Sequence, residues 1–129
     1  MKVLNFEDSI YKANAIRKVL NQCGVTKIEL VSNVEDGLQM LKNAEDTGEP
    51  FDLIITDMHY PMKHGAVSDT EAGEKLVQLL QEQGKQTKVI VCSSRNMKLP
   101  GVYGCIWYSE ISDWEEELCD LVREMEKNR

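Results

Sequence analysis

The sequence lacks the features of several large classes of protein. It has 15 lysines and arginines against 22 aspartates and glutamates, for a formal net charge of −7. Nucleic-acid binding needs clustered basic residues, so this balance argues against a direct nucleic-acid partner. No run approaches the roughly 20 apolar residues of a membrane span, and the start MKVLNFEDS lacks the apolar stretch of a signal peptide. We therefore expect a cytoplasmic protein that does not contact a membrane.

The four cysteines form no zinc or redox motif. Cys23, Cys92, Cys105 and Cys119 are scattered without a CxxC pair, and neither histidine has the spacing of a zinc ligand. Each cysteine lies in an apolar segment, where a free cysteine behaves as a small buried hydrophobic residue. We expect all four to be core residues.

The length and composition are those of one globular domain. A chain of 129 residues falls within the roughly 100–200 residues of a typical domain, and 42% apolar and 29% charged residues are ordinary proportions. The sequence contains no internal repeat, linker or low-complexity segment. We expect residues 1–129 to form a single domain without an attached output domain.

Short apolar runs alternate with segments of helical periodicity. The runs at 2–6, 27–31, 51–56, 88–92 and 104–108 predict five strands, and helical spacing recurs over 13–23, 34–41, 72–80 and 114–125. Ser9 and Asn33 are expected N-caps, and residues 112–115 read as a capping box. The alternation predicts an α/β fold, with an open five-stranded parallel sheet covered by helices on both faces.

Polar side chains follow the strands. Glu7 and Asp8 follow the first, Asp57 the third, and Ser93 and Ser94 the fourth. In open parallel sheets, ligands bind beyond the carboxyl ends of the strands, where the strand order reverses. Three carboxylates and two hydroxyls should therefore meet at one edge.

Crowded carboxylates repel one another unless a cation neutralises them, and Mg²⁺ prefers such oxygen ligands. The backbone carbonyl of His59 could complete the protein's share of the ligands. Beside the cation, an oxygen of Asp57 could attack a phosphoryl group, and the Ser93 hydroxyl could hydrogen-bond it, with Ser94 the weaker candidate. A single acid at a strand end is more often a helix cap or a solvated residue; the coincidence at three positions favours function.

At this point the chain resembles the response-regulator receiver domain, the phosphoacceptor half of two-component signalling. The matching segments are 3–9 (VLNFEDS), 51–61 (FDLIITDMHYP) and 89–94 (VIVCSS). The resemblance implies a flavodoxin-like doubly wound fold and Mg²⁺ (or Mn²⁺) binding. It also implies phosphotransfer from a histidine kinase or a histidine phosphotransfer protein, with a signal passed to an effector protein in trans.

The resemblance also assigns roles to individual residues. It makes Asp57 the phosphoacceptor, Asp8 a direct metal ligand and Ser93 the switch hydroxyl. Glu7 would act on the metal through a water molecule. By position, His59 and Arg95 would flank the phosphoryl group.

Three departures from the family pattern stand out. Tyr108 occupies the position at the end of the fifth strand where the family places a lysine, and a tyrosine brings no positive charge. Lys63 or Lys98 could reach in from a loop, although both are more simply explained as surface residues. The loop 62–71 is longer than usual, and is a candidate lid or partner contact or inert surface. The short connection 95–103 implies that the fourth helix of the family is short or missing.

Three functions therefore remain open. The first is a receiver that is not an enzyme beyond self-phosphorylation and self-dephosphorylation, acting either on an effector or as a relay intermediate. The second is a degenerate receiver, an interaction module that binds its partner constitutively. Its partner affinity would be unchanged by Asp57→Asn. The third is a small aspartate-nucleophile phosphatase or flavin protein. Both fit the sequence poorly. An aspartate-nucleophile phosphatase usually has a second aspartate at the position of His59, and a flavin protein usually has a hydroxyl- and glycine-rich phosphate loop where this chain has Glu7 and Asp8.

Overall fold

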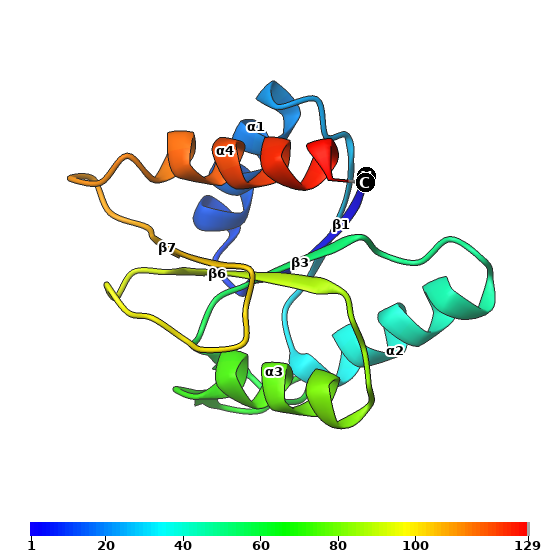
Figure 1. Cartoon of the computed structure of the whole chain (residues 1–129). Helices are drawn as coiled ribbons and strands as arrows, with labels where there is room; N and C mark the ends of the chain where they lie inside the picture. Colours follow the sequence, from blue (N-terminus) through cyan, green and yellow to red (C-terminus); the bar gives the residue numbers. More distant parts are fainter. Residues whose placement is uncertain (129) are drawn as a thin grey trace.

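Parallel strands form the centre of the molecule (Figure 1). The computed structural model describes residues 1–128. The main sheet has the order β2-β1-β3-β6-β7, which is the flavodoxin-like order of a doubly wound fold. Its strands are β1 (Lys2–Phe6), β2 (Lys27–Val31), β3 (Leu53–Thr56), β6 (Lys88–Ser93) and β7 (Gly104–Trp107). The fold class expected from the sequence is confirmed.

Two pairs of helices cover the sheet. Helices α1 (Ile10–Gln22) and α4 (Trp114–Lys127) lie on one face, and α2 (Val34–Asp46) and α3 (Ala72–Glu82) on the other (Figure 1). Within residues 1–128, no helix is long and apolar enough to cross a membrane.

The central strand β3 shows why its sequence is continuously apolar. Leu53 and Ile55 pack in the core cluster that contains residues of α1 and α4, whereas Ile54 packs in the cluster of α2 and α3. All three side chains are fully buried. Successive side chains of a strand point to opposite faces, so a sheet covered on both faces requires apolar residues at every position.

Side-chain caps open two of the helices as predicted. The Ser9 hydroxyl accepts a hydrogen bond from the Lys12 amide at the start of α1, and Asn33 Oδ1 accepts one from the Asp36 amide at 2.8 Å. The capping box predicted at 112–115 was wrong. The Ser112 hydroxyl instead donates to the carbonyl of Trp107 at 2.6 Å, so it closes the turn after β7, and α4 begins without a side-chain cap.

The prediction for the cysteines was correct for only part of the set. Cys92 is fully buried and Cys105 half-buried, and both are free. Cys23 and Cys119 form a disulfide, with their Cα atoms 5.9 Å apart. These residues are 96 positions apart in the chain, and they meet because α1 and α4 pack together on one face of the sheet.

The long segment after β3 is a hairpin. Strand β4 (Tyr60–Pro61) pairs antiparallel with β5 (Ser68–Asp69), so the expected loop 62–71 contains a short strand. Tyr60 is fully buried, and its hydroxyl shares a hydrogen bond with the Thr56 hydroxyl at 2.8 Å. This contact fastens the hairpin to the end of β3.

The connection between β6 and β7 contains no helix within residues 1–128, as the sequence predicted. It passes through Pro100 and Gly101, and Gly101 has φ +81°, a conformation that other residues rarely adopt. The segment from 95 to 103 is therefore a turn-rich link close to the carboxyl edge of the sheet.

Candidate functional site

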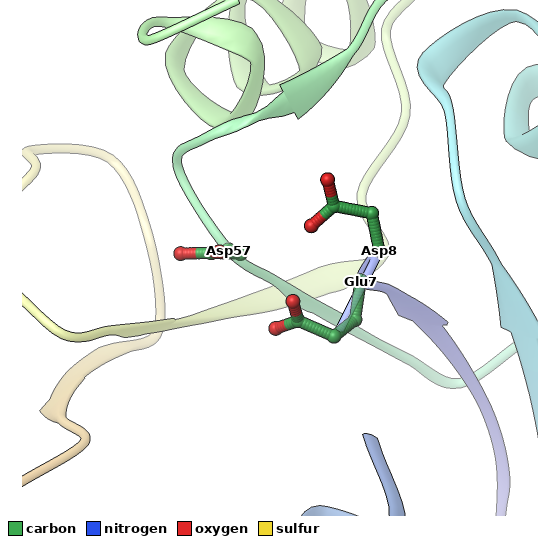
Figure 2. A group of neighbouring side chains, drawn as sticks. All are labelled: Glu7, Asp8 and Asp57. Carbon is green, nitrogen blue, oxygen red and sulfur yellow. The ribbon is translucent and has the colours of Figure 1, made fainter. Parts of the chain in front are cut away.

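Three carboxylates gather where the strand order reverses. Glu7 and Asp8 follow β1 and Asp57 follows β3, and these strands are neighbours, with Phe6 opposite Thr56. One oxygen from each acid lies within 4.8 Å of the others. Figure 2 shows the side chains of Glu7 and Asp8 extending from the end of β1 toward the side on which Asp57 lies. The structure therefore brings together the three acids that the sequence singled out.

Backbone contacts hold Asp57 in place. Its amide donates to the carbonyl of Phe6 at 3.1 Å, and its Oδ1 accepts a hydrogen bond from the Met58 amide at 2.7 Å. Gly73 of α3 packs so closely that an added Cβ would overlap the carbonyl oxygen of Asp57. Within residues 1–128, Asp57 Oδ2 accepts no hydrogen bond. One oxygen of the carboxylate is thus anchored and the other is free to react or to bind a cation.

Glu7 is a buried acid, only 2% exposed. The Ser9 amide donates to its Oε2 at 3.1 Å, and Oε1 lies 3.1 Å from the ammonium group of Lys12. Burial raises the pKa of Glu7; the Lys12 ammonium opposes this effect, and the Asp57 carboxylate reinforces it. A buried carboxylate is costly unless a positive charge lies close to it, and Lys12 places such a charge beside Glu7.

Lys12 is the functional residue that the sequence analysis missed. Its Nζ lies 3.1 Å from Glu7 Oε1 and 3.2 Å from Asp57 Oδ1, and it donates to the carbonyl of Cys92 at 2.5 Å. It also lies 5.3 Å from the ring centroid of Tyr108, in cation–π geometry. Burial alone would lower the pKa of Lys12, but the Glu7 and Asp57 carboxylates raise it above its ordinary value, so the side chain is a cation.

A signal for Lys12 was present in the sequence. Lys12 lies four residues before Ile16 and seven before Val19, and therefore on the apolar face of α1. A lysine there, only 7% exposed and just after two acids, needs a partner in the core. The two loop lysines considered from the sequence, Lys63 and Lys98, are exposed, and no ion pair within residues 1–128 joins them to the acids.

A cavity of about 490 Å³ opens beside the acids. Its lining contains most of the candidate residues from the sequence, together with Met58 and two hydroxyl residues of the hairpin region: Asp8, Asp57, His59, Ser93, Ser94, Arg95, Ser68 and Thr70. A larger cavity of about 690 Å³, lined mainly by residues of α2, contains none of the strand-end acids. The chemistry of the donor groups favours the smaller cavity as the functional site, and the hydroxyls from the hairpin region were not predicted.

The remaining candidates surround this cavity in different ways. Ser93 is 3% exposed, and its hydroxyl accepts a hydrogen bond from the Arg95 amide at 3.1 Å. The carbonyl of the exposed Ser94 accepts a hydrogen bond from the Trp107 indole at 3.1 Å. Tyr108 does not line the cavity. Its ring packs on Trp114 with centroids 4.9 Å apart, behind Lys12.

The donor set fits a divalent cation. Three carboxylates and one ammonium leave a local formal charge of two negative units. All the available ligand atoms of this cluster are oxygens, which Mg²⁺ and Mn²⁺ prefer over softer metals. Lys12 offsets only one of the three negative charges, so a cation beside Asp8 and Asp57 would neutralise the remainder.

Comparisons with known proteins place the fold. No protein-family model matches the sequence, and no curated protein matches it. Among solved structures, the receiver domain of a Francisella response regulator is 18% identical with a TM-score of 0.72, covering 99% of this chain and 98% of that chain. A chemotaxis response regulator of Vibrio cholerae is 21% identical with a TM-score of 0.66, over 96% and 97% of the two chains.

A third example is a response regulator in red light signaling of R. palustris, which is 19% identical with a TM-score of 0.68 and covers 93% of this chain and 90% of that chain. The structural similarity extends over nearly the whole chain in all three cases. The sequence identity is low, so the similarity supports the fold alone. This chain therefore has the fold of the response-regulator receiver domain.

Proposed function

We propose that this chain accepts a phosphoryl group on Asp57, with Mg²⁺ or Mn²⁺ bound beside it, and signals to a partner protein. The observation that carries the proposal is the state of the Asp57 carboxylate. Its Oδ1 is held by the Met58 amide and Lys12, whereas Oδ2 accepts no hydrogen bond within residues 1–128. A carboxylate oxygen of this kind, next to a cavity and two further acids, is suited to nucleophilic attack.

In the proposed reaction, the phosphodonor is a phosphohistidine of a histidine kinase or a histidine phosphotransfer protein. Asp57 Oδ2 attacks the phosphorus, a new O–P bond forms, and the N–P bond breaks with its electron pair remaining on the imidazole. Asp8 and Asp57 would hold the cation directly, Glu7 through water, and the His59 carbonyl would complete the set. When bound, the cation neutralises the charge on the phosphoryl oxygens.

Ser93 is the proposed switch hydroxyl. Its oxygen already accepts a hydrogen bond from the Arg95 amide, so its proton remains available to a phosphoryl oxygen in the cavity. A shift of Ser93 would move the segment that begins at Ser94, to which the Trp107 indole is bound. Such a movement would change the surface around β7.

The experiment that tests this function uses acetyl phosphate as a small phosphodonor. The purified protein is incubated with it, with and without Mg²⁺, and intact mass and tryptophan fluorescence are followed. We expect an adduct only with Mg²⁺, lost in Asp57→Asn and retained in Asp120→Asn, which removes an exposed acid on α4. A protein that forms no adduct while binding Mg²⁺ would contradict the proposal and favour the degenerate interaction module.

A further inference from the structure

The ammonium group of Lys12 has a fixed seat that does not depend on Asp57. The carbonyl of Cys92 accepts one of its hydrogen bonds, and the ring of Tyr108 lies behind it. Both groups are neutral and belong to β6 and to the residue that follows β7. The side chain is fully enclosed apart from 8% of its surface. The seat therefore presents the charge toward the acids whether or not Asp57 is modified.

The position of this charge matches the place where new charge would appear. Lys12 Nζ lies 3.2 Å from Asp57 Oδ1, the oxygen that is not free for attack. If Oδ2 becomes an ester oxygen, Oδ1 becomes a neutral carbonyl oxygen and the negative charge moves to the phosphoryl oxygens. An ammonium has three N–H groups, so one can turn from Oδ1 to a phosphoryl oxygen while another stays on Cys92.

We propose that Lys12 supplies, from the first turn of α1, the ammonium group that contacts and stabilises the phosphoryl group on Asp57. The inference rests on the proposed phosphorylation of Asp57 and adds the residue that performs this step. Tyr108, just after β7, then has a different role, because its ring supports the lysine from behind. Arg95 also lines the cavity, but it is exposed and its guanidinium contacts Met97.

The test measures the rate of adduct formation from acetyl phosphate at saturating Mg²⁺. We expect Lys12→Met to slow it about 100- to 1,000-fold, the range in which loss of one preorganised donor falls. Lys18→Met, which removes an exposed lysine of α1, should leave the rate unchanged. The double variant Lys12→Met/Tyr108→Lys places a lysine at position 108, next to the site of the lost ammonium group. It should restore most of the rate. A purely structural role for Lys12 would not produce this restoration.

The outcomes distinguish a failure of this inference from a failure of the proposed function. A wild-type adduct that forms at the same rate in Lys12→Met would overturn the role of Lys12 alone, and so would a slow Lys12→Met that Tyr108→Lys fails to accelerate. A wild-type protein that forms no adduct would overturn both proposals. If Lys12→Met does not fold, the rates of Glu7→Gln and Glu7→Gln/Lys12→Met are compared instead. Both variants lack the buried Glu7 carboxylate, so they differ only in the presence of the lysine. Equal rates in those two proteins would again overturn the inference.

Discussion

Removing the charge of Lys12 should destabilise the folded protein in a way that depends on pH. The side chains of Lys12 and Glu7 are 8% and 1% exposed, and their charged atoms lie 3.1 Å apart. Lys12→Met retains most of the side-chain volume and removes the cation, which leaves Glu7 as a buried acid without its partner. Breaking a buried pair in this way typically destabilises a protein by about 3–5 kcal/mol.

Protonation of Glu7 sets an upper limit on this loss. Neutralising a carboxyl group with an ordinary pKa of 4.5 costs about 1.4 kcal/mol for each pH unit above that value, or about 3.4 kcal/mol at pH 7. The pKa of Glu7 is already raised in the wild-type protein, mainly by burial, so part of this loss is present in both proteins. We therefore expect Lys12→Met to lower the free energy of unfolding by about 2–3 kcal/mol at pH 7.

The sign of the pH dependence follows from the same argument. In the variant, the pKa of Glu7 in the folded state is further above its unfolded value than in the wild type. The stability contributed by a raised pKa is present below the unfolded pKa and is lost as pH rises. The upper limit on the loss of stability is only about 0.7 kcal/mol at pH 5, so the two proteins should have nearly equal free energies of unfolding at that pH.

The assay is urea unfolding followed by tryptophan fluorescence at pH 7 and pH 5, in EDTA so that no divalent cation replaces the lysine. The matched control is Glu7→Gln/Lys12→Met, which removes both charges and should lie within about 1 kcal/mol of the wild type at either pH. Two results would refute the reasoning. One is a Lys12→Met variant as stable as the wild type at pH 7, and the other is a loss of equal size at both pH values.

Three further outcomes are expected. Gly73→Ala should destabilise the protein by about 1–2 kcal/mol in urea unfolding and slow adduct formation, because the new methyl group would overlap the backbone at Asp57; unchanged stability would contradict this packing. Mass spectrometry after iodoacetamide treatment at about pH 8 should show Cys105 modified and Cys92 intact, because burial raises the pKa of the Cys92 thiol to about 12. Mg²⁺ at about 100 times its Kd should stabilise the protein by about 2.7 kcal/mol in the same unfolding assay, and Asp8→Asn should weaken this effect if the acids bind the cation.

The local sequence was enough to predict the order of the elements and the acids of the site. Short apolar runs such as 53–55, bounded by polar residues, favour strands covered on both faces, and the carboxyl ends of parallel strands share an edge. Glu7, Asp8 and Asp57 were therefore identified by their positions directly after strands. These features follow from periodicity and topology, which are written along the chain.

Two of the features that the sequence did not reveal depend on contacts between distant segments. Lys12 reaches the acids because α1 packs beside β6, where Cys92 offers its carbonyl 80 residues along the chain. Cys23 meets Cys119 only because two helices share one face of the sheet. The spacing of a side chain in the sequence determines which face of its own helix or strand it occupies. Which distant residue it contacts depends on how the helices and strands pack together. The sequence by itself determined where the negative charge of this site lies, and the tertiary structure decided which cation faces it.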